Sequence, residues 1–227
     1  MRIGTWNLEG RWSAEHARLM QSWDCDLLLL TEVPTVATLP GYDLHRTVAW
    51  MQRGRVWSAV ASRTPARRLA DPHPASSLVR IDGLVACSSV LPWPLWRPTG
   101  DDDPWEGRQS QRMKTTCGVL QAAFEVVLGD ASSGSGLIWG GDWNTPLEGS
   151  LAGFDRGAQE AVLAVVDALD LHVPTRSLPS GSGASIDHIA IPRAWSVRDV
   201  RHEVVERGLS DHWAYVVDVD RRPLGDV

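Results

Sequence analysis

Short apolar runs separated by polar and turn residues predict a chain built mainly of strands. Continuous runs such as Leu27–Leu30 and Leu137–Trp139 are typical of strands buried on both faces. Strands are expected over Arg2–Leu8, Asp26–Glu32, Trp57–Ser62, Ser77–Ile81, Leu84–Leu91, Leu137–Asp142, Ser185–Ile191, Val197–Val205 and His212–Asp218. Pro34 is expected to end the second of these, and Asp82-Gly83 to form a turn between the fourth and the fifth.

Three segments have the composition and spacing of helices, and no boundary divides the chain. Ala14–Ser22 follows Ser13, a suitable N-cap, and Ala158–Leu169 carries apolar residues at helical spacing. Arg108–Leu128 is long enough for a helix. Loops rich in Pro, Gly or Ser are expected over Pro92–Gly107, Ala131–Gly136 and Pro179–Ala184. We therefore expect one domain over residues 1–220 and a short C-terminal tail over 221–227.

Composition indicates an ordinary globular protein. Of the 227 residues, 43% are hydrophobic and 22% are charged, which suits one sizeable core. No apolar run approaches the roughly 18 residues of a membrane span. No secretory signal is expected, because the sequence enters strand-like residues at Ile3. The 3 cysteines form no CxxC pair, which favours reduced thiols. These features predict a cytoplasmic protein.

The net charge of -6 argues against a protein that coats nucleic acid through a broad basic face. It does not exclude a nuclease, because an acidic metal site itself lowers the net charge.

Candidate chemistry is concentrated where the predicted strands end. In Gly140–Asn144, two glycines allow a close turn, and the side chains of Asp142 and Asn144 would project to the same side of an extended backbone. Further polar residues at strand ends are Asn7, Glu32, Asp187, His188, Asp211 and His212. Each alone is explained by a turn, a cap or a first exposed residue. Five such sites together favour a ligand, because ligands commonly bind outside strand ends.

The residue types narrow the chemistry. Glu32 offers oxygen ligands that suit Mg2+, and Asp142 could deprotonate or orient a water. His212 could donate to a phosphoryl oxygen, with a carboxylate fixing its tautomer. Asn7 and Asn144 could supply neutral donors or ligands. This set fits metal-assisted hydrolysis of a phosphoester.

Five motifs in order resemble the endonuclease/exonuclease/phosphatase superfamily, which includes deoxyribonuclease I-like and exonuclease III-like enzymes. The family pattern is an Asn after the first strand, a Glu after the second, GDxN, a later Asp on a strand, and a terminal SDH. The matching segments are Thr5–Asn7, Leu30–Val33, Gly141–Asn144, Ile186–His188 and Ser210–His212. One such motif is weak evidence, whereas all five in order are a specific signal across nearly the whole chain.

The resemblance implies an α/β fold, a four-layer α/β sandwich with two mostly antiparallel sheets face to face and helices outside. It also implies Mg2+ or Mn2+, bound by Glu32 with Asn7 and Asp211 as ligands or close neighbours of the metal. Asp142 would activate the attacking water and His212 would contact the scissile phosphate. The same resemblance implies that Asn144 hydrogen-bonds the phosphate, that Asp187 orients a neighbouring site residue, and that Asp211 also belongs to the catalytic set.

One departure concerns the central strand. Family members usually carry a His or Tyr there, supported by the Asp that corresponds to Asp187, but Val85–Trp93 contains neither. Ser88, Ser89 or Trp93 could occupy that space, and the partner of Asp187 stays open. His188 is expected to point to the opposite face.

Arg108 and Arg112 could reach a substrate phosphate, and Trp93 could stack on a base. The ordinary alternatives are a solvated helix face and packing.

The leading hypothesis is a divalent-metal-dependent phosphoesterase that hydrolyses phosphodiesters, most simply a nuclease or DNA-repair-type phosphodiesterase acting on DNA or RNA. The alternatives are a small-molecule or lipid-headgroup phosphatase and a catalytically weakened binding protein on the same fold.

Overall fold

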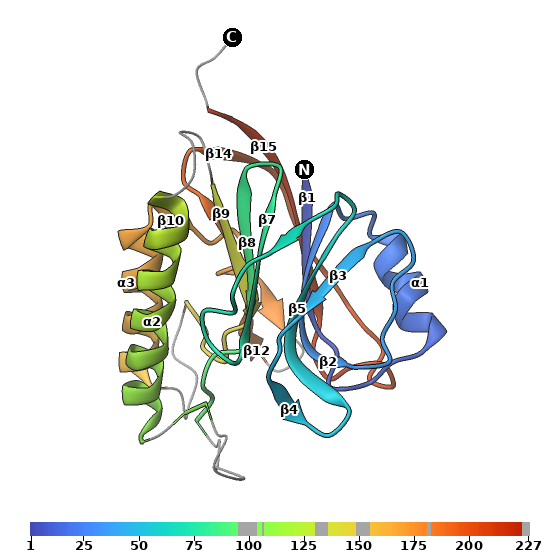
Figure 1. Ribbon diagram of the computed structural model, residues 1–227, viewed down its shortest axis with the longest axis horizontal. Coiled ribbons are helices and arrows are strands. Elements are labelled where there is room, and N and C mark those ends of the chain that lie inside the picture. The colour runs from blue at the N-terminus through green and yellow to red at the C-terminus, as the bar shows by residue number, and fades with distance from the viewer. Residues whose placement is uncertain (95–103, 106, 130–135, 149–154, 181–182, 224–227) are drawn as a thin grey trace.

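Two β-sheets pack face to face between outer helices (Figure 1). The computed structural model describes residues 1–94, 104–105, 107–129, 136–148, 155–180 and 183–223. The first sheet contains β1 (Arg2–Asn7), β2 (Leu27–Pro34), β3 (Asp43–Arg46), β4 (Trp50–Gln52), β5 (Arg55–Ser62), β14 (Trp195–Glu203) and β15 (Ala214–Pro223). The second contains β6 (Arg67–Arg68), β7 (Ser76–Ile81), β8 (Leu84–Ser89), β9 (Leu137–Asp142), β10 (Leu171–His172) and β13 (Asp187–Pro192).

Strand order explains how distant segments meet. The first sheet runs β14-β15-β1-β2-β5-β3, with β4 also paired to β5, and the second runs β10-β13-β9-β8-β7-β6. Within the described residues only β1–β2 and β8–β9 are parallel, and every other strand pair is antiparallel. Each parallel pair places two strand ends at the same edge of its sheet, which gathers the polar residues that follow them.

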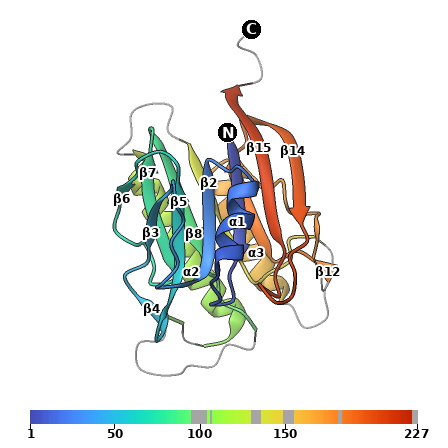
Figure 2. The ribbon, with the colours of Figure 1, turned by 90° about the vertical axis from the view of Figure 1, so that its right-hand side faces the viewer.

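Three buried layers hold the sandwich together. Between the sheets lie apolar side chains from both, including Ile3, Leu29, Val60, Ile138 and Val217. Helix α1 (Ala14–Ser22) covers the outer face of the first sheet through residues such as Met20. Helices α2 (Gln109–Gly129) and α3 (Arg156–Ala168) cover the outer face of the second sheet. Figure 2 views the sandwich from the side of α1, which lies in front of the sheets. The expected four-layer α/β sandwich is therefore confirmed.

Local sequence signals account for much of this arrangement. Asp82 and Gly83 have φ of 46° and 78°, the left-handed backbone that a two-residue hairpin turn between β7 and β8 requires. Helix α1 has the predicted bounds, and so does β9. Helix α3 is capped at its N-terminus by Asp155, whose side chain accepts a hydrogen bond from the backbone N–H of Gly157 at 2.8 Å.

Other expectations need correction. Strand β2 continues two residues past Glu32 to Pro34, which ends the strand as expected and pairs with Arg55 of β5. The short strands β3, β4, β6 and β10 were not expected, and the predicted Ser/Gly loop Pro179–Ala184 contains β11 (Pro179–Ser180) paired with β12 (Gly183–Ala184). Most of the predicted loops Pro92–Gly107 and Ala131–Gly136 lies outside the described residues. The last strand ends at Pro223 rather than Asp218.

Two further features concern the cysteines and the helices. Cys25, Cys87 and Cys117 are all buried and unpaired, and burial raises the pKa of each thiol to about 12. Such thiols are inert packing groups rather than nucleophiles. In the described part of the chain, no helix combines the length and apolarity needed to cross a membrane.

Candidate active site

The polar residues predicted from the motifs meet at one end of the sandwich, across the seam between the two sheets. Asn7 and Glu32 end or nearly end the parallel strands β1 and β2. Asp142 is the last residue of β9 and pairs in register with Asp187, the first residue of β13. His212 lies just before β15. Side chains spread over 205 positions of sequence therefore share one site.

Asn7 bridges the two sheets. Its Nδ2 donates to Oε1 of Glu32 at 3.2 Å and to Oδ2 of Asp142 at 2.9 Å, and lies 3.5 Å from Nε2 of His212. Its Oδ1 accepts from the backbone N–H of Glu9 at 2.8 Å, which fixes the orientation of the amide. The structure thus presents Asn7 to the two carboxylates as a donor. The role of metal ligand expected for it stays a prediction.

Glu32 is held in an unusual backbone conformation and by a cation. Its φ is 51°, in the left-handed region that few side chains adopt without a structural reason. Its Oε2 accepts from Nη1 of Arg55 at 2.5 Å. Arg55 was not among the residues singled out from the sequence, because nothing in the motif pattern marks it.

The Gly-Gly segment before Asp142 serves close packing. A Cβ on Gly140 would lie 2.5 Å from the carbonyl oxygen of His188, and one on Gly141 would lie 2.3 Å from that of Ser89. Gly141 also has a φ of 122°, which favours glycine. Both residues therefore let β9 approach its neighbours, and the approach places Asp142 at the seam.

Asn144 makes polar contacts at the site, whereas its neighbour Trp143 packs in the core. The backbone N–H of Asn144 donates to Oδ1 of Asp142 at 3.0 Å, and its Nδ2 donates to the carbonyl oxygen of Leu91, also at 3.0 Å. Trp143 is buried and packs against Trp139 with ring centroids 4.2 Å apart. Asn144 thus orients Asp142, while its proposed contact with a phosphate stays a prediction.

The partner of Asp187 is His212. Oδ2 of Asp187 lies 2.7 Å from Nδ1 of His212, and both side chains are largely buried. Ser210 fixes the backbone at His212, because its Oγ donates to the carbonyl oxygen of Asn7 at 2.7 Å and accepts from the backbone N–H of His212 at 3.0 Å. His188 points to the opposite face, as expected, with Nε2 3.1 Å from the carbonyl oxygen of Thr145.

Burial and neighbouring charge shift both central titrating groups. Burial raises the pKa of Asp142 to about 7, and the charges of Asp187 and Glu32 push it the same way. Burial alone would lower the pKa of His212. The charge and hydrogen bond of Asp187, with the charges of Asp142 and Asp211, outweigh burial and raise it well above its usual value. Near neutral pH the site therefore combines a carboxylate able to take a proton with an imidazolium able to give one.

Ser88, Ser89 and Trp93 each have partners other than Asp187 among the described residues. Ser88 Oγ donates to the carbonyl oxygen of Leu30 at 2.8 Å, and Ser89 Oγ accepts from Nε1 of Trp139 at 3.1 Å. Trp93 packs at the edge of an aromatic cluster, with its ring 5.7 Å from that of Trp105.

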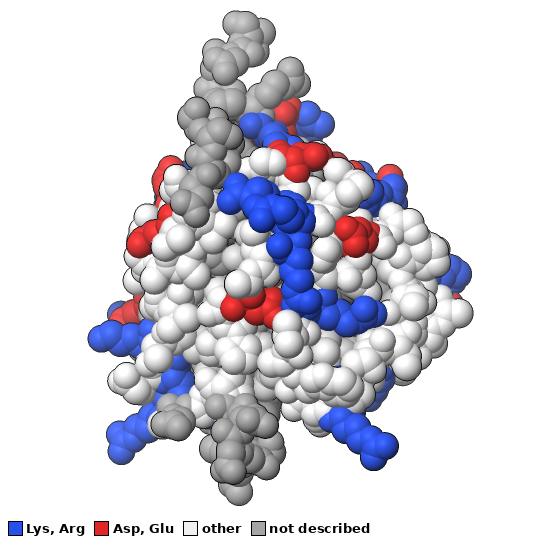
Figure 3. All heavy atoms as spheres, viewed as in Figure 1, with Lys and Arg blue, Asp and Glu red and all other residues white. Residues whose placement is uncertain are grey.

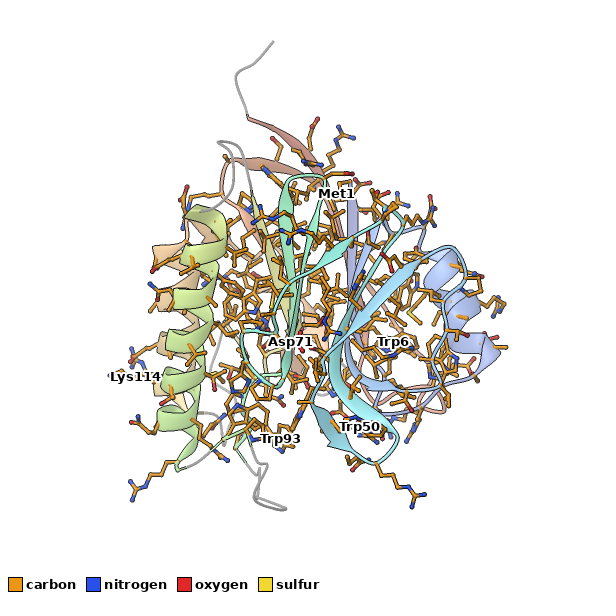
Figure 4. All side chains as sticks on the ribbon, viewed as in Figure 1. Met1, Trp6, Trp50, Asp71, Trp93 and Lys114 are labelled. Atoms are coloured by element: carbon orange, nitrogen blue, oxygen red, sulfur yellow. The ribbon has the colours of Figure 1, made fainter. Side chains whose placement is uncertain are left out.

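This aromatic cluster comprises Trp57, His73, Trp93 and Trp105. Trp57 and Trp105 meet edge to face at 5.0 Å, and Val90 packs beside them in the stretch where a His or Tyr was missing. Trp93 and Trp50 lie at the end of the molecule opposite Met1 (Figure 4). That is the end at which β1 and β2 finish, so the cluster flanks the site.

The three predicted substrate-binding residues lie in different surroundings. Arg112 is buried at the start of α2 and its Nη2 donates to the carbonyl oxygen of Trp93 at 3.4 Å. Arg108 is exposed just before the helix. Trp93 is half-buried. Arg112 thus holds the segment that carries Trp93, and the contact of all three with substrate stays a prediction.

Asp211 stands at the rim. Its side chain is 67% exposed, with Oδ1 3.8 Å from Nε2 of His212. Its backbone N–H donates to Oε2 of Glu9 at 3.0 Å, and Oε1 of Glu9 pairs with Arg11 at 2.8 Å. This chain of contacts ties the loop before β15 to the end of β1.

A cavity of about 580 Å³ opens beside Asp187 and His212. Two arginines contribute to its wall, Arg11 and Arg207, together with Trp213. A guanidinium pair beside an imidazolium suits an anionic group. Neither arginine had been singled out from the sequence.

The donor set fits a hard divalent cation. Ligand atoms of Asp142, Asp187 and His212 lie within 4.8 Å of one another, but Asp187 and His212 are already bonded to each other. Oε1 of Glu32 and Oδ2 of Asp142, which share one amide donor of Asn7, are the better oxygen ligands. Buried Oδ1 of Asp187 also lacks a hydrogen-bond partner among the described atoms. The crowded carboxylates indicate that added positive charge would be stabilising.

A separate group of arginines lies away from this site. Figure 3 shows basic side chains running across one side of the sandwich. Arg67 of β6 pairs in register with Arg80 of β7, and Nη2 of Arg68 donates to the carbonyl oxygen of Arg46 at 2.8 Å. Arg80 pairs with Val85 at the start of β8, the end of the sheet opposite the site. These arginines therefore do not form the site.

No protein-family model matches the chain, and no curated protein matches its sequence. Solved structures do match. An AP endonuclease from Archaeoglobus fulgidus superposes with a TM-score of 0.71 at 15% identity, covering 97% of this chain and 99% of that one. The 3′ phosphatase NExo from Neisseria, bound to a product DNA hairpin, gives 0.70 at 17% identity, covering 97% and 99%.

The catalytic domain of Xenopus laevis APE2 gives a TM-score of 0.66 at 15% identity, covering 96% of this chain and 91% of that one. Matches over almost the full length of both chains, at such low identity, establish a shared architecture. The chain therefore has the fold of the endonuclease/exonuclease/phosphatase superfamily, as the order of its five motifs implied.

Proposed function

We propose that this protein is a divalent-metal-dependent phosphoesterase that hydrolyses phosphodiester bonds in nucleic acid. The observation that carries the proposal is the convergence of Glu32, Asn7, Asp142, Asp187 and His212 in one hydrogen-bonded site at the seam of the sheets. Stability alone does not call for buried carboxylates placed around an imidazole.

The cation would be held by Glu32 and Asp142, with Asp211 at the rim, and Mg2+ or Mn2+ suits these oxygen donors. When bound, it would neutralise negative charge on the phosphate. Asp142, oriented by the N–H groups of Asn7 and Asn144, accepts a proton from the attacking water. His212, held as an imidazolium by Asp187, donates a hydrogen bond to a phosphoryl oxygen and stabilises the charge that develops there.

Nucleic acid is the favoured substrate class. The AP endonuclease and the DNA-bound 3′ phosphatase among the similar structures act on DNA or are bound to it. The arginines beside the cavity next to His212 and the aromatic cluster near the seam suit a phosphate backbone and a base or sugar.

The direct test is cleavage of a labelled duplex containing an abasic site, and of undamaged duplex and single strand, in Mg2+ or Mn2+. Activity should disappear in EDTA and in Asp142→Asn and His212→Ala. Asp199→Asn, an exposed change on β14, is the control and should behave as wild type. Undiminished cleavage by Asp142→Asn or in excess EDTA would overturn the proposal.

A second candidate is a phosphomonoesterase acting on a nucleic-acid end or a small molecule. The similarity to a 3′ phosphatase and the net charge of -6 favour it. Release of inorganic phosphate from a 3′-phosphorylated oligonucleotide, without strand cleavage, would select this candidate over the first.

A further inference from the structure

Arg55 occupies a position that determines what Glu32 can bind. It is the first residue of β5 and pairs in register with Pro34, the last residue of β2. Its Nη1 lies 2.5 Å from Oε2 of Glu32, and the two side chains are only 21% and 16% exposed. Oε1 of the same carboxylate is already engaged by Asn7 at 3.2 Å. Both oxygens of the expected metal ligand therefore have partners from the chain itself.

The guanidinium of Arg55 lies in a narrow slot formed by the backbone. Gly10, with φ of 68°, faces it so closely that a Cβ would lie 2.1 Å from Nε and from Nη2 of Arg55. The N–H of Gly10 donates to the carbonyl oxygen of Glu32 at 3.0 Å. Only a residue without a side chain leaves room for the guanidinium there. The turn after β1, the end of β2 and the start of β5 thus jointly define this slot.

The ion pair between Arg55 and Glu32 affects how a metal can bind. Within the described residues, Arg55 is the one basic side chain that forms an ion pair with Glu32. A divalent cation at Oε1 would share one carboxylate group with the positive guanidinium, which is bonded to Oε2. Two cations repel at that distance in a half-buried site, where screening by water is weak.

We infer that Arg55 is a resident counter-ion of Glu32 that competes with the metal and, once displaced, binds a substrate phosphate at the rim of the site. The inference rests on the proposed metal-dependent function. A guanidinium released from a carboxylate keeps its planar set of donors, and these match phosphate oxygens as well as carboxylate oxygens. Metal and substrate binding would then be linked, because the cation frees the group that holds the substrate.

The test is direct Mn2+ binding, measured by calorimetry or by the electron paramagnetic resonance signal of free Mn2+. Arg55→Gln should bind Mn2+ roughly tenfold more tightly than wild type, the factor expected for losing one charge-assisted hydrogen bond to the ligand. Arg53→Gln, an exposed change in the same hairpin, should leave the affinity unchanged. Gly10→Ala, which displaces the guanidinium while keeping Arg55, should also tighten Mn2+ binding.

The substrate arm uses the cleaved oligonucleotide at saturating Mn2+. Arg55→Gln should raise KM several-fold with a smaller change in kcat, and Arg55→Lys should recover part of the loss. Equal or weaker Mn2+ binding by Arg55→Gln would overturn the inference, since it would mean that Arg55 merely positions Glu32.

Failure of the proposed function would look different. Wild type would then bind no Mn2+ at millimolar concentration, or Glu32→Gln would bind it as tightly as wild type. An unfolded Arg55→Gln would be recognised by circular dichroism, and Gly10→Ala would then decide the question.

Discussion

Nδ1 of His212 lies 2.7 Å from Oδ2 of Asp187, although the two residues are 25 positions apart, one at the start of β13 in the second sheet and the other just before β15 of the first. The carboxylate raises the pKa of the imidazole against the effect of burial. Asp187→Asn should therefore lower the pKa of His212 toward its usual value and reduce kcat by roughly 10²–10⁴. The pKa is measured by NMR titration of the imidazole. An unchanged pKa in Asp187→Asn would contradict this assignment, and Asp199→Asn is the matched control.

Ionised Asp142 should destabilise the metal-free folded protein. Its pKa is raised from 3.8 to about 7, so the native state binds more protons than the unfolded state between those pH values. The free energy of unfolding of the metal-free protein therefore falls as the pH rises across this window. Asp142→Asn should remove this loss of stability and raise the free energy of unfolding at pH 8 by as much as about 4 kcal/mol. The gain is reduced by the attraction between Asp142 and protonated His212, which the variant also loses. Urea unfolding in EDTA at pH 4 and pH 8 measures the difference, which should be small at pH 4.

Added metal should stabilise the protein in a pH-dependent way. Divalent cations bind the deprotonated carboxylates, and binding to the native state alone raises the melting temperature. Millimolar Mg2+ should raise Tm more at pH 8, where Asp142 is ionised, than at pH 5. Differential scanning fluorimetry measures the shift, and Glu32→Gln should abolish most of it. An equal shift at both pH values would indicate binding elsewhere.

Gly141 should tolerate no side chain. An alanine Cβ there would meet the carbonyl oxygen of Ser89 at 2.3 Å, with φ at 122°. Gly141→Ala should destabilise the protein by about 2–4 kcal/mol and reduce activity by moving Asp142. Gly83→Ala is the control, because Gly83 has φ of 78° but open space around it, so it should cost only about 1 kcal/mol. Equal losses in the two variants would show that backbone conformation, rather than crowding, matters at Gly141.

Arg112 and Arg108 should differ in what they affect. Arg112 is buried and donates to the carbonyl oxygen of Trp93, so Arg112→Gln should lower the free energy of unfolding by about 1–3 kcal/mol. Exposed Arg108→Gln should leave stability unchanged. If either arginine binds substrate, its variant should raise KM beyond any loss of folded protein. Chemical unfolding and steady-state kinetics on the same preparations separate the two effects.

The motif residues were predictable because each is marked locally. Glu32 follows a run of four leucines, and Asp142 follows an apolar strand and two glycines, so a strand end could be assigned to each. The turn at Asp82-Gly83 was equally clear, because few dipeptides suit left-handed backbone at both positions. Each of these signals lies within a few neighbouring residues, and sequence patterns can identify only such local features.

The partners of these residues were not predictable in the same way. Arg55 lies two residues before the predicted strand Trp57–Ser62 and belongs to no motif, and only the pairing of β2 with β5 brings it to Glu32. The pairing of Asp187 with His212 depends on how one sheet packs on the other. Short strands such as β6 contain too few residues for an alternating pattern, and they form because β7 offers an edge.

The amide of Asn7 joins Glu32 of one sheet to Asp142 of the other. The width of the active site is therefore set by the thickness of the apolar layer between the sheets, where Leu29 lies against Gly140 so closely that a Cβ on the glycine would be 2.7 Å from Cδ1 of the leucine. A variant with a slightly thicker interior would keep every polar side chain, stay folded, and hold its carboxylates at the wrong spacing. In this molecule the size of the buried side chains is part of the catalytic geometry.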